Sequence, residues 1–307
     1  MTNSPIRLAT RSSPLALWQA HFVAERLRPV VAPRPVAIVH IETHGDRDQA
    51  TALSAMGGFG VFTKAIQQSL LDQRADIAVH SLKDLPTILT PGVTLTAVPP
   101  RGPTGDVLIS RTVKRFDDLP RGATVGTSSL RRRAMILNRR PDLKMVDLRG
   151  NVDTRLRKLD ELKLDGIVLA EAGLVRLGLA DRIVEVLNAE WMLPAVGQGA
   201  IGLECREADH EIRHFAEALS DPETLARVIA ERAMLATLGG GCLVPIGATS
   251  VVSHGQLTLR GMVLSPDGVR KIVATHSGSI AAPLAVGQEL AGQLLAAGAA
   301  EILPALV

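Results

Sequence analysis

Aromatic residues and cysteine are scarce in this chain of 307 residues. Aromatic residues make up 2% of it, tyrosine is absent, and Cys205 and Cys242 are the two cysteines. So few aromatics leave little for nucleic acid bases to stack on, and we expect no nucleic acid partner. Two cysteines cannot form a disulfide framework or a zinc cluster, so a special role for either one must be chemical.

Long apolar runs are also missing. No stretch of about 18 uncharged apolar residues occurs, and the opening segment MTNSPIRLATRSSPLALWQA has no basic region leading into an apolar core. The sequence therefore indicates neither membrane spanning nor secretion, and we expect a cytoplasmic protein. Its hydrophobic content of 46% allows a substantial core and two or three domains.

Lysine is scarce in comparison with arginine. Of the 34 basic residues seven are lysine and 27 are arginine, while the net charge is only +3. The planar guanidinium group binds carboxylates and phosphates bidentately, which the lysine ammonium cannot do. The arginines thus predict a small polyanionic ligand, and nucleic acid binding through residues 131–140 is the weaker alternative.

Strand-like and helical patterns alternate through the first two thirds of the chain. Strands are expected at 6–10, 36–43, 75–81, 106–110, 123–129, 143–150 and 165–173, with helices from Pro14 and around 60–73. Such alternation favours two α/β units with mostly parallel sheets. Segments 98–106 and 193–204, rich in proline or glycine, are candidate hinges.

The last third has the pattern of a smaller α+β unit. A helix is expected to begin with Asp221 as its N-cap and Pro222 as its first residue, and to stop at Gly239. Antiparallel hairpins are expected to turn at His254-Gly255 and Asp267-Gly268, and the tail from Ala281 is expected to be a helix.

Two serine pairs stand between a strand and a helix. In ATRSSPLAL, Ser12 or Ser13 can cap the helix that opens at Pro14, and the free N–H groups there attract an anion beside Arg11. The alternative is a cap with an ordinary surface arginine.

The same arrangement recurs in GTSSLRRRAMILNRR, where Ser128 and Ser129 precede a helix that opens with three arginines. Cations in a first turn oppose the helix dipole, so they are expected to serve a ligand. We expect one or two of Arg131, Arg132 and Arg133 to reach the ligand and the third to be solvated.

Further arginines follow in LRGNVDTRLRKL and AGLVRLG. Arg149 is expected on a glycine-bearing loop, and Arg155 and Arg157, two residues apart, cannot share one helix face. One of them should face the ligand and the other solvent. From its own segment, Arg176 is more simply interpreted as a plain helix-surface residue.

Polar residues also follow the predicted strand in AVHSLKDLP. His80, Ser81, Lys83 and Asp84 stand where open α/β sheets place their working residues, and Asp84 is the natural acid-base or cation-stabilising group. The alternative is an aspartate that only completes a turn. No G-x-S-x-G elbow is present, so a serine hydrolase is excluded.

Cys242 follows three glycines in LGGGCLVPIG. A buried cysteine is the commonest case, but the glycines let other groups approach the thiol closely. A nucleophile or covalent anchor fits this setting better.

Seven ordered motifs resemble the hydroxymethylbilane synthase family, also called the porphobilinogen deaminase family. They are ATRSSPLALWQA, AVHSLKDLP, GTSSLRRR, LRGNVDTRLRKL, LAEAGLVRLG, PAVGQGAIGLE and GGGCLVPIGA, and they span nearly the whole chain. The resemblance implies a transferase of tetrapyrrole (heme) biosynthesis. Such an enzyme condenses four porphobilinogen molecules head to tail, with loss of ammonia, onto a covalent dipyrromethane cofactor, and releases hydroxymethylbilane by hydrolysis. We expect a monomer.

The resemblance also implies the fold. We expect two periplasmic-binding-protein-like α/β domains with mostly parallel sheets and a cleft between them, and a smaller α+β C-terminal domain. The expected boundaries are 1–99 with 200–217 for domain 1, 105–193 for domain 2 and 222–307 for domain 3, which carries the cofactor cysteine.

Residue by residue, the resemblance implies that Asp84 is catalytic, holding pyrrole N–H groups and stabilising the cation formed as ammonia leaves. It implies covalent attachment of dipyrromethane through Cys242. The implied cofactor-binding residues are Lys83, Ser129, Arg131, Arg132 and Arg149. The implied substrate-binding residues are Arg11, Ser13, Arg155 and Arg176, and no metal is implied.

The chain departs from the family pattern at a few positions. Phe59 stands where a lysine is usual, Ala65 stands where a glutamate is usual, and RGPTGDVL replaces a more acidic run. A two-lobed anion-binding or sensor protein remains the rival interpretation. That interpretation gives no chemical role to Cys242 on its glycine-rich loop.

Overall fold

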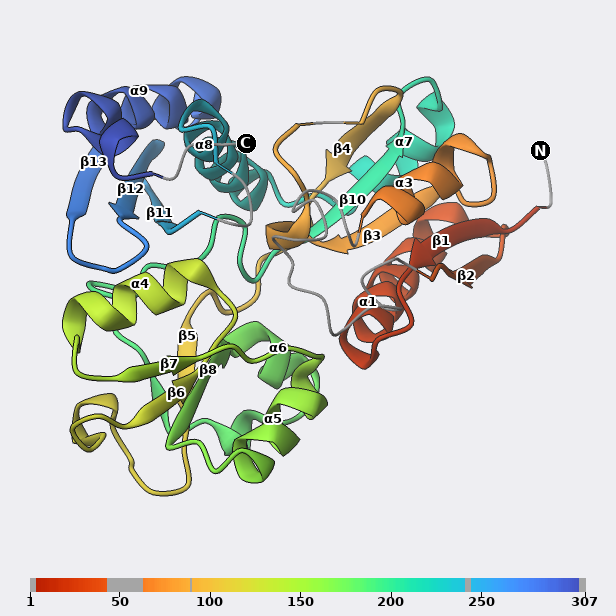
Figure 1. Ribbon diagram of the computed structural model, residues 1–307. Coiled ribbons are helices and arrows are strands. Elements are labelled where there is room, and N and C mark those ends of the chain that lie inside the picture. The colour runs from red at the N-terminus through yellow and green to blue at the C-terminus, as the bar shows by residue number, and fades with distance from the viewer. Residues whose placement is uncertain (1–3, 43–62, 89, 241–243, 304–307) are drawn as a thin grey trace. The chain divides into compact units, whose positions relative to one another are not determined.

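The computed structural model describes residues 4–42, 63–88, 90–240 and 244–303 (Figure 1). The chain divides into two compact units, which are described separately. Unit 1 comprises Met1–Gly102 and Ala200–Leu225, and unit 2 comprises Pro103–Gly199 and Ala226–Val307.

Unit 1 is built on a five-stranded sheet with the strand order β2-β1-β3-β10-β4 (Figure 1). Its strands are β1 (Ile6–Thr10), β2 (Val36–His40), β3 (Ile77–Ser81), β4 (Val93–Ala97) and β10 (Ile201–Arg206). Its helices are α1 (Pro14–Val31), α3 (Lys64–Leu71), the 3-10 helix η1 (Leu82–Asp84) and α7 (His210–Glu217). β1 is parallel to β2 and β3, whereas β10 is antiparallel to β3 and β4.

Alternate residues of these strands pack on opposite faces of the sheet. Leu8 and Val79 pack with α1 and α7 on one face, while Ala9 and Ala78 pack with α3 on the other. Cys205 is buried in the first cluster, as predicted, and burial raises the pKa of its thiol to about 12. The Cys205 thiol is therefore a core group with no nucleophilic character.

Unit 2 contains a second five-stranded sheet, with the order β7-β6-β8-β5-β9. Its strands are β5 (Asp106–Ile109), β6 (Thr124–Gly126), β7 (Lys144–Val146), β8 (Gly166–Ala170) and β9 (Glu185–Val186). The associated helices are η2 (Phe116–Asp118), α4 (Leu130–Arg139), α5 (Val152–Glu161), α6 (Glu171–Arg176) and η3 (Ala180–Arg182). β6 is parallel to β7 and β8, and β5 is antiparallel to β8 and β9.

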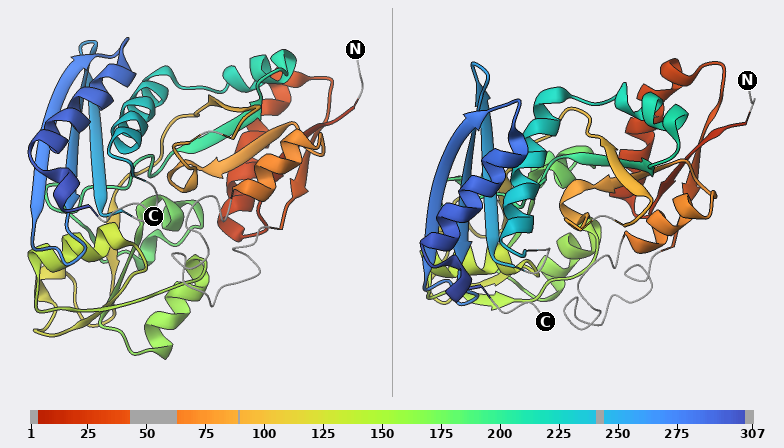
Figure 2. Two further views of the ribbon diagram at one scale, coloured as in Figure 1. Left: turned by 45° about the horizontal axis from the view of Figure 1, so that its top comes forward. Right: turned by 90° about the horizontal axis from the view of Figure 1, so that it is seen from above.

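The rest of unit 2 is an antiparallel sheet covered by helices, and Figure 2 shows α9 lying along it. Its elements are α8 (Pro222–Thr237, which begins in unit 1), β11 (Ile246–Ser253), β12 (Gln256–Leu264), β13 (Lys271–Ser279), α9 (Pro283–Ala296) and η4 (Ala299–Glu301). Leu257 and Leu259 of β12 pack against Leu290 and Leu294 of α9. This sheet also shares a core with α4, because Met262 clusters with Met135.

The predicted α/β units and the smaller α+β unit are confirmed, with one refinement of the sheets. Four strands of each five-stranded sheet run in one direction, and the fourth strand in the order, β10 or β5, runs in the opposite direction. The sheets are therefore mixed. The segment 193–204, predicted as a hinge, runs into β10, which lies inside the sheet of unit 1.

The local signals of the last third are confirmed. The backbone N–H of Thr224 donates to Asp221 Oδ1 at 2.8 Å at the start of α8, and α8 ends two residues before Gly239, whose φ is +68°. His254 and Gly255, both with positive φ, form the two-residue turn between β11 and β12. No helix in the described part of the chain has the length and apolar character of a membrane span.

Candidate functional site

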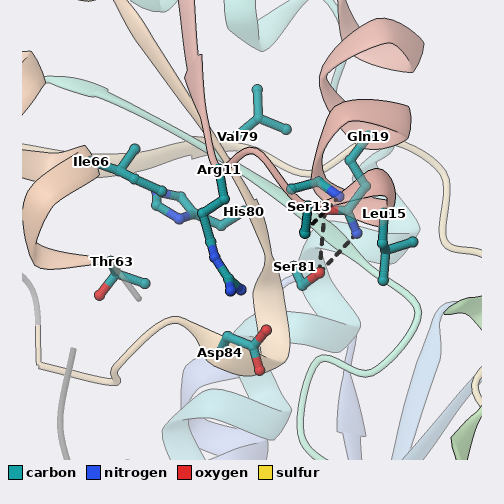
Figure 3. A pocket seen from close by; sticks show the side chains of 11 residues that line it. Arg11, Ser13, Leu15, Gln19, Thr63, Ile66, Val79, His80, Ser81 and Asp84 are labelled. Carbon is teal, nitrogen blue, oxygen red and sulfur yellow. Dashed lines mark hydrogen bonds between the residues drawn. The ribbon is translucent and has the colours of Figure 1, made fainter. Parts of the chain in front are cut away.

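Unit 1 has a pocket at the ends of β1 and β3 (Figure 3). The residues that line it are Arg11, Ser13, Leu15, Ala16, Gln19, Thr63, Ile66, Val79, His80, Ser81 and Asp84. Three of them, Arg11, Ser13 and Asp84, are predicted site residues from two motifs about 70 residues apart. Parallel pairing of β1 with β3 brings the two motifs to the same edge of the sheet.

The serine of the first motif caps a helix, as predicted. The backbone N–H of Ala16 donates to Ser13 Oγ at 3.4 Å, and Pro14 opens α1. One turn further, the buried Gln19 donates to Ser81 Oγ at 2.8 Å, which ties α1 to the end of β3. The wall of the pocket is therefore held by hydrogen bonds between its own elements.

Asp84 lies in η1, directly after β3, and is half-buried. Figure 3 shows the side chain of Arg11 projecting into the same space as the Asp84 carboxylate. Such a pocket offers one guanidinium and one carboxylate to a ligand, and so suits a molecule that carries both negative charge and N–H donors. Lys83 is half-buried in the same turn but does not line the pocket.

Unit 2 has the second serine-capped helix. The backbone N–H of Arg132 donates to Ser129 Oγ at 3.4 Å, so Ser129 caps α4. Of the three arginines in its first turn, Arg133 is exposed, whereas Arg131 and Arg132 are each only 4% exposed. The predicted separation of one solvated arginine from the other two is thus observed.

The two buried arginines share one carboxylate. Arg131 Nη1 lies 2.6 Å from Asp106 Oδ2, and Arg132 donates to Asp106 Oδ1 through Nε at 2.9 Å and Nη2 at 2.7 Å. Arg131 also donates to the carbonyl oxygen of Leu193, and Arg132 to that of Val168. Gln198 adds a further donor to Asp106 at 3.0 Å.

Asp106 is fully buried, and burial alone would raise the pKa of its carboxyl group. The charges of Arg131 and Arg132 outweigh that effect and hold the pKa below its ordinary value of 3.8. Two arginines and one carboxylate leave the cluster with one net positive charge. Arg131 Nε is buried and has no hydrogen-bond partner among the described residues. An anion bound nearby would balance the positive charge of the cluster and accept a hydrogen bond from Arg131 Nε.

Arg149 and Arg155 lie at the loop between β7 and α5. Ser128 donates to the Leu148 carbonyl oxygen at 2.5 Å, and Arg155 Nε donates to the Gly150 carbonyl oxygen at 2.8 Å. Gly150 has φ +116°, and a Cβ there would approach Thr154 to 2.5 Å, so the loop requires glycine.

The two members of the arginine pair on α5 differ as predicted. Arg157 is exposed and pairs with Glu161 at 2.6 Å, whereas Arg155 is half-buried against its own loop. Arg176 is half-buried at the end of α6, where it donates to the Gly199 carbonyl oxygen at 2.6 Å. Burial lowers the pKa of Arg176 to about 10, so it remains a cation at neutral pH.

Sequence reasoning missed part of the site. Gln19 and Thr63 line the pocket, and Asp106 anchors two of the predicted arginines. A signal for Asp106 was present, because an acid opens the apolar strand DVLI just before an arginine-rich helix. Cys242 and Phe59 lie outside the described residues, and no metal-binding group of His, Cys, Asp and Glu occurs in the described ranges.

Two family models cover most of the chain. Residues 6–214 match "Porphobilinogen deaminase, dipyromethane cofactor binding domain", and residues 225–296 match "Porphobilinogen deaminase, C-terminal domain". The chain is 48% identical over 306 residues to a porphobilinogen deaminase of Syntrophotalea carbinolica, covering 100% of this chain and 97% of that protein.

Solved structures show a more distant likeness. A methionine-binding lipoprotein of Bacillus subtilis is 13% identical, with a TM-score of 0.44 over 71% of this chain and 90% of that one. A periplasmic substrate-binding protein of an ABC transporter from Coxiella burnetii is 15% identical, with a TM-score of 0.45 over 72% and 94%. Both TM-scores are too low to establish a shared fold.

Proposed function

Because this chain belongs to the porphobilinogen deaminase family, we propose that it is a hydroxymethylbilane synthase. It joins four porphobilinogen molecules head to tail and releases the linear tetrapyrrole by hydrolysis. In each condensation a bond forms between the aminomethyl carbon of one pyrrole and the free α-carbon of another. Ammonia leaves, and the α-carbon loses a proton. The observation that carries this proposal is the pocket that brings Arg11, Ser13 and Asp84 together.

Asp84 is the catalytic residue of this proposal. Its carboxylate accepts hydrogen bonds from pyrrole N–H groups and stabilises the positive charge that develops on the substrate as ammonia leaves. Its place in η1, among the residues that line the pocket, supports that role. Arg11 and Ser13 bind a substrate carboxylate, because a guanidinium and a capped helix start both favour an anion.

The residues at the start of α4 suit a dipyrromethane whose side chains are carboxylates. Ser129, Arg131 and Arg132 would hold it, because two guanidinium groups gather there on the single carboxylate of Asp106, and the buried Arg131 Nε has no hydrogen-bond partner among the described residues. The cofactor supplies the first pyrrole α-carbon to which substrate is added. Asp106 keeps the two guanidinium groups in place and is not itself a ligand.

Four further residues complete the proposal. Lys83 and Arg149 bind the cofactor, and Arg155 and Arg176 bind substrate carboxylates. The half-buried positions of all four support these roles, because a guanidinium or ammonium partly removed from water interacts more strongly with an anion.

Cys242 anchors the dipyrromethane through a thioether in this proposal. Intact-mass spectrometry of protein expressed in a heme-producing host should show the chain mass increased by two pyrrole units. The Cys242→Ser variant should show the bare mass and no turnover. A wild-type protein at its bare sequence mass, with no adduct, would contradict covalent attachment.

The localisation, oligomeric state and partners of the protein are proposed from its family membership. We propose a cytoplasmic monomer with porphobilinogen as its partner and no nucleic acid partner. We also propose three domains, at 1–99 with 200–217, 105–193 and 222–307, because each of these segments holds one of the three sheets.

The rival function is that of a protein that only binds anions. Such a protein would leave porphobilinogen unconsumed, which a turnover assay detects directly.

A further inference from the structure

A buried carboxylate in unit 1 has no part in the site described so far. Glu204, on β10, is 0% exposed, and its Oε2 lies 3.0 Å from Nε2 of His80 on β3. The side chain of His80 is 3% exposed and lines the pocket that contains Asp84 (Figure 3). One side of this His80–Glu204 contact is therefore core, and the other is the pocket wall.

The strand register explains why the two side chains meet. His80 pairs with Gly202 across the β3–β10 ladder, and Glu204 lies two residues further along β10. Residues two apart on a strand point to the same face of a sheet, so Glu204 is the diagonal neighbour of His80.

The carboxylate is held from a third element as well. Gln67 on α3 donates through Nε2 to both oxygens of Glu204, each at 3.0 Å. Thr90 in turn donates to Gln67 Oε1 at 2.9 Å, which fixes the orientation of the amide. Because α3, β10 and the segment after η1 all contribute, Glu204 has little freedom to turn away from His80.

This arrangement determines which imidazole nitrogen is available to a ligand. Among the described residues Nε2 makes no well-aligned hydrogen bond, and Oε2 of Glu204 lies 3.0 Å from it. An N–H on Nε2 makes this contact attractive, whereas a nitrogen lone pair there would be repelled by the carboxylate oxygen. The hydrogen therefore belongs on Nε2, and Nδ1 is the nitrogen left for the pocket.

We propose that Glu204 is a positioning residue, which orients His80 so that Nδ1 accepts a hydrogen bond from an N–H group of the aminomethylpyrrole substrate beside Asp84. This inference rests on the proposed function. It adds His80 to the substrate-binding residues and gives the buried network of Glu204, Gln67 and Thr90 a role in turnover.

The test is a double-mutant cycle on porphobilinogen consumption by the holoenzyme. Glu204→Gln and His80→Gln should each lower kcat/KM by about tenfold, the effect of one lost hydrogen bond. The double variant should be no worse than either single variant, because Glu204 acts only through His80. Losses that multiply in the double variant would overturn the proposal.

A second pair of variants keeps the proposal testable if Glu204→Gln does not fold. The amide of asparagine reaches the position of Nδ1, whereas that of glutamine reaches the position of Nε2. His80→Asn should therefore retain several times more activity than His80→Gln. Equal activities, or the opposite order, would refute a role for Nδ1.

Asp76→Asn is the matched control. Asp76 immediately precedes β3, at the end of that strand opposite to the pocket, and pairs with Arg7 at 2.9 Å and Arg206 at 3.3 Å. The Asp76→Asn substitution should lower the melting temperature and leave kcat/KM unchanged. If Glu204→Gln behaves in the same way, Glu204 is merely structural. Absence of turnover in the wild type would instead reject the proposed function, and this inference with it.

Discussion

The two five-stranded sheets share one strand order, but the buried carboxylates on their corresponding antiparallel strands have different partners. β1, β2, β3 and β4 occupy the positions that β6, β7, β8 and β9 occupy in the other sheet, and β10 corresponds to β5. The antiparallel strand carries a buried carboxylate in both cases, Glu204 on β10 and Asp106 on β5.

The partners of these two carboxylates differ. Glu204 faces His80 and Gln67, whereas Asp106 faces two arginines that are always charged. The buried carboxylate of unit 1 thus contacts no permanently charged side chain among the described residues, whereas that of unit 2 lies in a cluster of two arginines and one carboxylate. In the proposed function, the sheet of unit 1 supports chemistry on a developing cation and that of unit 2 supports binding of an anionic cofactor.

The largest expected effect concerns the loop after β3. Asp84→Ala should lower kcat for porphobilinogen by about 10³-fold, because a charge-stabilising carboxylate is lost. The half-buried side chain should leave the far-UV circular dichroism and melting temperature close to wild type. Asp72→Ala, at the exposed end of α3, is the control and should retain full activity. Near-normal turnover by Asp84→Ala would remove Asp84 from the mechanism.

The second expected effect tests the charge difference between the sheets. Asp106→Asn should reduce the free energy of unfolding by about 3 kcal/mol, because it leaves two guanidinium groups buried without a counter-charge. Chemical denaturation measures this loss. Asp117→Asn, which breaks the exposed pair with Arg139, should change stability little. Comparable losses of stability in the two variants would show that the buried ion pairs of Asp106 contribute no more to stability than the exposed pair of Asp117.

The third expected effect is the pH dependence of that same cluster. The pKa of Asp106 is lowered on folding, so its stabilising contribution is present above about pH 4 and is lost as pH falls. The difference in melting temperature between wild type and Asp106→Asn should therefore narrow in acid. A difference that stays constant down to pH 2 would mean that the carboxylate is not the titrating group.

The smallest expected effect tests the likeness of the two helix starts. Ser13→Ala and Ser129→Ala should each lower the free energy of unfolding by about 1 kcal/mol, because each cap accepts one backbone N–H at 3.4 Å. Both should also raise KM if the serines bind ligand. Ser12→Ala, at an exposed position beside the first cap, should change neither quantity.

The amino-acid sequence by itself determined the local features. Ser13, Ser129 and Asp221 cap helices, and His254-Gly255 turns a hairpin, as predicted. These features depend on hydrogen bonds and backbone preferences within three or four residues, which the local pattern contains. The motifs around Asp84 and Cys242 also sufficed to indicate the family, because each is a short run of adjacent residues.

Only the tertiary structure decided what the charged residues contact. Arg131 and Arg132 had the appearance of free ligand-binding cations, yet both are buried on Asp106, which comes from a different element. The antiparallel strand β10 escaped the local pattern because it is supplied by a segment far along the chain from the rest of its sheet. The partnership of Glu204 with His80 depends on that pairing, since the ladder between β3 and β10 sets which side chains share a face.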